Sequence, residues 1–123
     1  MERDLSALRA LAVPGPYVTS SLTIAESRRA VVRARSAGRI SASQERDALL
    51  SIDAFARRCT VVGVADVILE RAGRPFPLEP IRTLDAIHLA TIELLDSPHE
   101  GMTVVSRDAR ICDNARALGL VVE

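Results

Sequence analysis

The stretch RTLDAIHLA, Arg82 to Ala90, has the apolar pattern of a helix that packs in a hydrophobic interior. Thr83 is placed to cap this helix, which we expect to continue to about Asp96. The first turn nevertheless carries an acidic residue, Asp85, and His88 follows one turn later. A carboxylate in a buried helix requires a chemical explanation, because burying a charge is costly unless the charge is compensated.

Strand-like and helix-like segments alternate along the rest of the chain. Strands are expected at 17–19, 59–63, 102–105 and 120–122, and helices at 2–12, 22–37, 42–58, around 67–69, at 83–96 and at 108–118. Parallel strands need helical crossovers, so this alternation predicts an α/β domain with a mainly parallel sheet flanked by helices. In such sheets, functional sites form beyond the carboxyl ends of the strands.

Local signals mark where several helices begin and end. Ser20 or Ser21 can cap the helix at 22–37, and Gly38 suits a left-handed position just after it. Ser41 and Gln44 form a capping-box pattern before the next helix. The segment 74–80 contains three prolines and is expected to be a loop.

Length and composition limit the classes of protein that this chain can be. Its 123 residues suit a single domain, 1–123. Hydrophobic residues make up 48% and aromatic residues only 2%, so the core should be aliphatic. The net charge is zero, which argues against a strongly basic nucleic-acid clamp. All 16 basic residues are Arg, which fits the codon bias of a GC-rich genome better than selection for phosphate binding.

The compartment is expected to be the cytoplasm. Cys59 and Cys112 are isolated, which predicts neither a disulfide framework nor a zinc site and favours a reducing environment. We find no signal segment and no apolar run near the ~20 residues that a membrane-spanning helix needs.

Three acidic residues stand at positions that can open on one edge of a parallel sheet. Glu26 lies early in a helix after a strand, Asp85 lies in the first turn of its helix, and Asp108 follows a strand directly. Carboxylates gathered there would repel one another unless a cation joined them. Mg²⁺ and Mn²⁺ accept oxygen ligands of this kind. Taken singly, Asp85 and Asp108 could instead be helix caps or solvated charges, and Glu26 could pair with Arg29.

The local sequence around these acidic residues resembles that of a known family. The segments Ser20 to Glu26, Leu84 to Ala90 (LDAIHLA), Ser106 to Arg110 (SRDAR) and Ala115 to Gly119 (ARALG) resemble the PIN domain, and more narrowly the VapC-type toxins of bacterial toxin–antitoxin pairs. The resemblance extends from about Glu2 to Val122. It implies a three-layer fold with a central sheet between helices.

The same resemblance implies an activity. It implies a metal-dependent endoribonuclease that cleaves single-stranded RNA, with Glu26, Asp85 and Asp108 as catalytic residues that bind Mg²⁺ or Mn²⁺. Asp85 would then be a metal ligand held rigid by its apolar neighbours. The resemblance further implies a cognate antitoxin protein and a homodimer as partners. Arg28, Arg29, Arg33, Arg107 and Arg110 are candidates for RNA contact, none with an assigned role.

Two further residues are expected to stay outside the metal site. His88 shares a helix face with Asp85, but packing or hydrogen bonding explains it better than metal binding. Asp113 has Arg110 and Arg116 three residues away, which makes a surface ion pair the simpler explanation.

The opening of the chain departs from the family pattern. PIN domains of this type begin with an apolar strand that ends in a metal-binding Asp, whereas Met1-Glu2-Arg3 is too polar to form a strand before Asp4. Residues 2–12 fit the family's second helix, so the first strand is expected to be missing through truncation, a misassigned start or degeneration, or to be supplied by another chain. We therefore expect little or no ribonuclease activity from this chain alone.

Two other functions compete with the nuclease. A non-catalytic PIN-like module could dock an antitoxin or a dimer partner. A phosphotransfer-receiver-like domain would need a Lys, and the chain has none.

Overall fold

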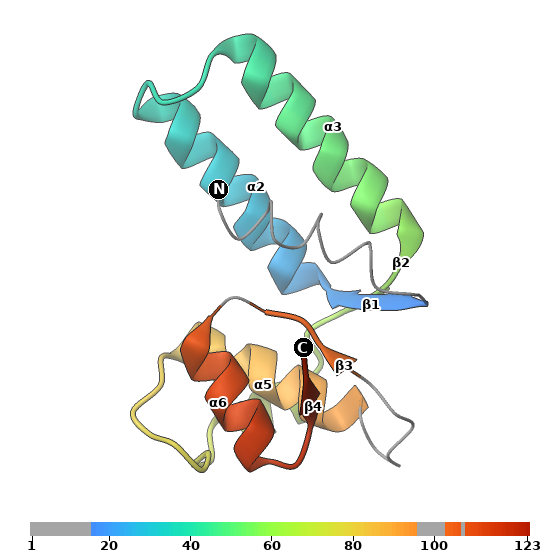
Figure 1. Cartoon of the computed structure of the whole chain (residues 1–123), viewed down its shortest axis with the longest axis vertical. Coiled ribbons are helices and arrows are strands. Elements are labelled where there is room, and N and C mark those ends of the chain that lie inside the picture. The colour runs from blue at the N-terminus through green and yellow to red at the C-terminus, as the bar shows by residue number, and fades with distance from the viewer. Residues whose placement is uncertain (1–15, 96–102, 107) are drawn as a thin grey trace. The chain divides into compact units, whose positions relative to one another are not determined.

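The computed structural model describes residues 16–95, 103–106 and 108–123 (Figure 1). The chain divides into two compact units, Met1–Gly63 and Val64–Glu123. The described part of the first unit contains β1 (Tyr17–Ser20), α2 (Ser21–Ser36), α3 (Ala42–Arg58) and β2 (Cys59–Val62). That of the second contains α4 (Asp66–Ala72), α5 (Thr83–Leu95), β3 (Thr103–Val104), α6 (Ala109–Ala117) and β4 (Val121–Val122). The expected helix at 2–12, and with it the question of a missing first strand, lies outside the described residues.

The first unit is a pair of parallel strands joined by a helical hairpin. β1 pairs with β2 in a register that runs from Tyr17 opposite Cys59 to Ser20 opposite Val62. The helices α2 and α3 form the long connection that a parallel pair requires, and they lie side by side in Figure 1. Val31 and Ile52 are the large aliphatic residues buried in this hairpin.

The predicted helix ends of the first unit are confirmed. Ser20 is the N-cap of α2 and accepts a hydrogen bond from the Thr23 amide at 3.1 Å. Ser41 and Gln44 form the complete capping box of α3. Gly38, just after α2, has a φ of 73°, the left-handed conformation that glycine adopts without a steric penalty.

The second unit contains the main hydrophobic core. β3 and β4 are parallel, with Thr103 opposite Val121. α6 packs against β4 and α5, and α5 packs against α4. The buried core residues are Ile68, Phe76, Ala86, Leu89, Ala90, Val104, Ile111, Ala115 and Leu120. The core is aliphatic as predicted, apart from the Phe76 ring.

The α/β class with parallel strands is confirmed, and the structure corrects one detail of it. The segment 102–105 was expected to be a buried strand. Residue 102 lies outside the described residues, β3 ends at Val104, and of the two residues of β3 only Val104 is buried. Val105, just after β3, is 45% exposed, because successive side chains of an extended segment point to opposite sides. None of the helices in the described ranges is long and apolar enough to cross a membrane.

Candidate functional site

Asp85 is a buried carboxylate on α5. The residue is only 6% exposed, and it directly precedes Ala86 in a helix whose Leu89 and Ala90 are fully buried. Its Oδ2 atom is buried and has no hydrogen-bond partner among the residues that the structure describes. The sequence therefore placed Asp85 correctly in the first turn of a core helix, and the structure shows that helix capping does not satisfy this oxygen.

The buried carboxylate of Asp85 is a position where a cation would fit. A buried carboxylate oxygen without a partner lowers folding stability, and native proteins keep few such groups. A hard divalent cation would satisfy such an oxygen, because these ions bind anionic oxygen ligands. The donor set fits Mg²⁺ or Mn²⁺ better than softer metals, because the predicted ligands are all carboxylates.

Asp108 lies between β3 and α6 and is partly buried. It is the N-cap of α6, and its Oδ1 accepts a hydrogen bond from the Arg110 amide at 3.0 Å. Its own amide donates to the Ser106 hydroxyl at 3.1 Å. The capping role considered for Asp108 is thus confirmed. A carboxylate has two oxygens, so a cap through one oxygen is compatible with metal binding through the other.

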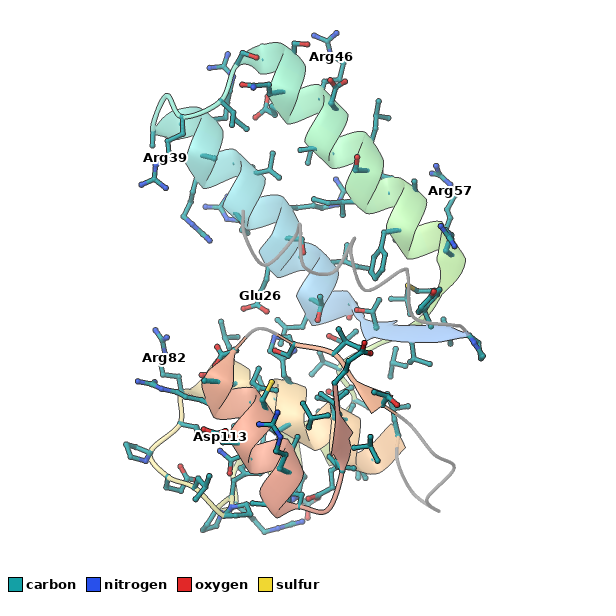
Figure 2. The ribbon with its side chains drawn as sticks, in the orientation of Figure 1. Glu26, Arg39, Arg46, Arg57, Arg82 and Asp113 are labelled. Carbon is teal, nitrogen blue, oxygen red and sulfur yellow. The ribbon has the colours of Figure 1, made fainter. Side chains whose placement is uncertain are left out.

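Glu26 lies on α2 in the first unit and is partly buried. Figure 2 shows its side chain on the side of α2 that faces away from α3. The surface pair with Arg29 considered for it is not formed, because no ion pair of Arg29 occurs in the described part of the chain.

The three predicted ligands are therefore divided between the two units. Asp85 and Asp108 belong to Val64–Glu123, and Glu26 belongs to Met1–Gly63. In neither unit do three His, Cys, Asp or Glu side chains of the described residues gather in a group that could hold a metal ion. The joint site of Glu26, Asp85 and Asp108 remains a prediction.

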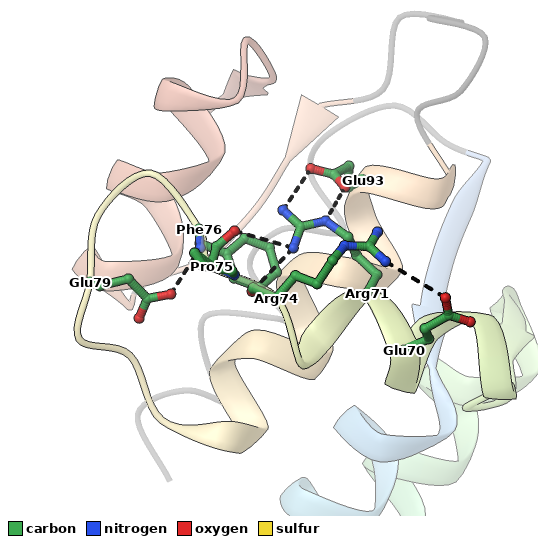
Figure 3. A network of polar contacts seen from close by, with 7 residues as sticks. All are labelled: Glu70, Arg71, Arg74, Pro75, Phe76, Glu79 and Glu93. Atoms are coloured by element: carbon green, nitrogen blue, oxygen red, sulfur yellow. Dashed lines mark hydrogen bonds and ion pairs between the residues drawn. The ribbon is translucent and has the colours of Figure 1, made fainter.

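A network of polar contacts fixes the segment that leads from α4 to α5 (Figure 3). Arg71 of α4 donates to both carboxylate oxygens of Glu93 on α5, at 2.6 and 3.4 Å. Its guanidinium also lies 3.9 Å from the centre of the Phe76 ring and donates to the carbonyls of Arg74 and Pro75 at 3.3 and 3.4 Å. A guanidinium can make these contacts simultaneously because it is planar and carries five donors.

Glu79 holds the second half of the same loop. Its two carboxylate oxygens accept hydrogen bonds from the amides of Phe76 and Ile81, at 2.8 and 3.0 Å. Thr83, two residues after Ile81, begins α5, so these bonds fix the entry into the helix that carries Asp85. The sequence predicts only a proline-rich loop here. It gives no signal for the roles of Arg71 and Glu79, because their partners are defined by packing.

A pocket of about 480 Å³ lies between α4, the loop and α5. Its walls include Leu69, Glu79, Thr83 and Ile87. Asp85 does not line it, because residues two positions apart on a helix point in different directions. The pocket is therefore separate from the candidate metal ligand.

The two residues expected to stay outside the site lie as follows. Asp113 forms an exposed ion pair with Arg116 at 3.4 Å, which confirms the surface explanation. His88 is partly buried on α5, one turn after Asp85.

Comparison with known proteins identifies the family. The chain matches the PIN domain over residues 2–117, which spans both units. The chain therefore belongs to the PIN domain family, whose members are mostly nucleases that use divalent metals. The comparisons with curated proteins and with solved structures found no match.

Proposed function

We propose that this PIN domain is a metal-dependent endoribonuclease that cleaves single-stranded RNA, as the toxin component of a toxin–antitoxin pair. The observation that carries this proposal is the buried Asp85, whose Oδ2 accepts no hydrogen bond from any of the described residues. Family membership supports the reaction class. The local similarity to VapC-type toxins in the segments around Glu26, Asp85 and Asp108 supports the narrower assignment.

The roles of the chain's residues follow from where they lie. Asp85, Glu26 and Asp108 would hold Mg²⁺ or Mn²⁺, which when bound supplies charge neutralisation at the scissile phosphate and lowers the pKa of a water. Asp85 is buried, and Glu79 holds the loop that leads into α5, which would limit the movement of the Asp85 carboxylate. Asp108 is fixed by its position as the cap of α6. We expect the activity of this chain alone to be low.

Metal binding is the most direct test. Calorimetric titration with Mn²⁺ should show one class of site in the unaltered protein and none in Asp85→Asn. Asp113→Asn is the matched control, because it removes an exposed carboxylate from the same unit. A Mn²⁺ titration that is silent for the unaltered protein, or unchanged by Asp85→Asn, would contradict the proposal.

RNA cleavage is the second test. Single-stranded RNA incubated with the protein and Mg²⁺ or Mn²⁺ should be cut slowly. Adding EDTA, or replacing the protein with Asp85→Asn, should abolish the cleavage. Cleavage that survives in EDTA would show that the reaction does not depend on these carboxylates.

The second candidate function is a non-catalytic module that docks an antitoxin or a second copy of the chain. Exposed aliphatic side chains in the second unit favour it, notably Val67 at 57%, Leu69 at 48% and Leu84 at 46% exposure. A module would bind its partner with no Mn²⁺ site, whereas the proposed toxin has both. Light scattering of the purified protein, alone and co-expressed with the product of the adjacent gene, tests the homodimer and the antitoxin.

A further inference from the structure

Charge is distributed very unevenly between the two units, although the whole chain is neutral. Residues 1–63 contain ten Arg and six acidic residues, whereas residues 64–123 contain six Arg and ten acidic residues. The zero net charge, which argued against a strongly basic nucleic-acid clamp, is therefore the sum of a basic unit and an acidic unit. A charge asymmetry between halves of a chain is typical of proteins that bind a polyanion with one half.

The arginines of α2 differ in whether they already have a partner. Arg28 forms an ion pair with Asp53 of α3, and Arg35 lies 3.9 Å from Glu45. Arg29 and Arg33 are exposed, and neither has an ion pair within the described part of the chain. Ion pairing between the helices thus occupies Arg28 and Arg35 and leaves Arg29 and Arg33 available.

The available arginines share a face of α2 with Glu26. Val31 and Ala34, at 0% and 3% exposure, define the buried side of the helix. At about 100° per residue, Arg29 and Arg33 lie on the opposite side, in line with Glu26 three and seven residues earlier. Figure 2 shows Arg39, just beyond the end of α2, on the same side of the hairpin as Glu26.

We propose that Arg29 and Arg33 form a binding site for the phosphates of single-stranded RNA, in line with Glu26. Their positions are about 6 Å apart along the helix axis, at a rise of about 1.5 Å per residue. Guanidinium groups bind phosphate oxygens through paired hydrogen bonds, and they position the strand without reading its sequence. This site rests on the proposed function, because Glu26 marks where the strand is cut.

The test measures binding without cleavage. Fluorescence anisotropy of a labelled oligouridylate is recorded in EDTA over a series of salt concentrations, so that the result does not depend on metal or catalysis. Arg29→Ala/Arg33→Ala should weaken binding. It should also make the slope of log K against the logarithm of the salt concentration shallower by about 1.4, since each lost phosphate contact on a single strand removes about 0.7 from that slope. Arg29→Lys/Arg33→Lys should keep most of the salt dependence, because the charges remain.

Arg46 and Arg57 provide the matched control. Both are exposed on α3, and no ion pair joins either of them to another of the described residues. Arg46→Ala/Arg57→Ala removes the same charge from the same hairpin and should leave most of the salt dependence in place. Equal losses in the two double variants would overturn the proposed site, because binding would then follow overall charge.

Two other outcomes separate this inference from the proposed function. RNA binding that depends on Arg29 and Arg33, without any Mn²⁺ site, would keep the inference and refute the nuclease. A Mn²⁺ site and cleavage that are both indifferent to Arg29→Ala/Arg33→Ala would keep the nuclease and refute the inference. An acidic peptide that binds in an Arg29- and Arg33-dependent way while RNA does not would also refute it.

Discussion

Asn114 of α6 forms hydrogen bonds with both the amide and the carbonyl of Leu78. Its Oδ1 accepts a hydrogen bond from the Leu78 amide at 2.8 Å, and its Nδ2 donates to the Leu78 carbonyl at 3.0 Å. Nδ2 also donates to the Arg110 carbonyl at 3.2 Å. Asn114 is 1% exposed, so water cannot replace these bonds. The loop before α5 is thereby tied to α6, the helix that Asp108 caps.

Asn114→Asp tests this tie. The carboxylate can still accept from the Leu78 amide, but it cannot donate to the two carbonyls, and it adds a buried charge. We expect a loss of about 2–4 kcal/mol in the free energy of unfolding, measured by urea denaturation. The neighbouring exposed change, Asp113→Asn, should stay within about 0.5 kcal/mol of the unaltered protein. Equal stabilities for the two variants would show that the Leu78 contacts contribute little.

Arg71→Lys tests the network between α4 and α5. Lys keeps the positive charge, but it cannot contact both oxygens of Glu93 while reaching the loop carbonyls. Because the Arg71 side chain is only 13% exposed, we expect a loss of about 1–3 kcal/mol in urea denaturation. Arg74→Lys is the control. Its side chain is 59% exposed and lies 3.8 Å from Glu70, so the change should cost less than about 0.5 kcal/mol.

Asp85→Asn should have opposite effects on stability with and without metal. In EDTA the variant should unfold at the same temperature as the unaltered protein or at a higher one, because a buried charge with an unsatisfied oxygen has been removed. Mn²⁺ at about 100 times its Kd should stabilise the unaltered protein by about 2.7 kcal/mol and leave the variant unchanged. Differential scanning calorimetry checks both. Equal stabilisation of the two proteins by Mn²⁺ would exclude Asp85 as a ligand.

Cys59 should react slowly with alkylating reagents. Burial raises the pKa of the Cys59 thiol above its ordinary value, and the neighbouring Arg58 cation offsets only part of this. The rate with iodoacetamide near pH 8.5, about the pKa of a free thiol, should be lower than that of free cysteine. Cys112→Ser provides a background without the second thiol. Adding urea should restore the rate of free cysteine, and a fast reaction in the folded protein would contradict the expectation.

The same shift fixes the sign of a pH effect on stability. The unfolded thiol loses its proton at its ordinary pKa, whereas the folded thiol keeps its proton to higher pH. The unfolded state therefore binds fewer protons in this window, and the free energy of unfolding should fall as the pH rises above the ordinary thiol pKa. Cys59→Ser should lack this component when urea denaturation is compared across that range.

The sequence by itself determined the local features of this protein. The sequence predicted the cap at Ser20 or Ser21, the capping box at Ser41 and Gln44, and the left-handed Gly38, because each depends on residues within one helical turn. The alternation of strands and helices likewise predicted the parallel pairing, since only a helical connection can return the chain to a parallel strand.

Only the tertiary structure decided which side chains are paired. Asn114 and Leu78 are 36 residues apart, and Arg71 and Glu93 are 22 apart, so no local pattern joins them. Arg28 and Arg29 are adjacent and chemically identical, yet Arg28 is paired with Asp53 whereas Arg29 has no ion pair with any other described residue. The physical reason is that pairing depends on which faces of the helices meet when the core packs, a property that identical neighbours in sequence do not share.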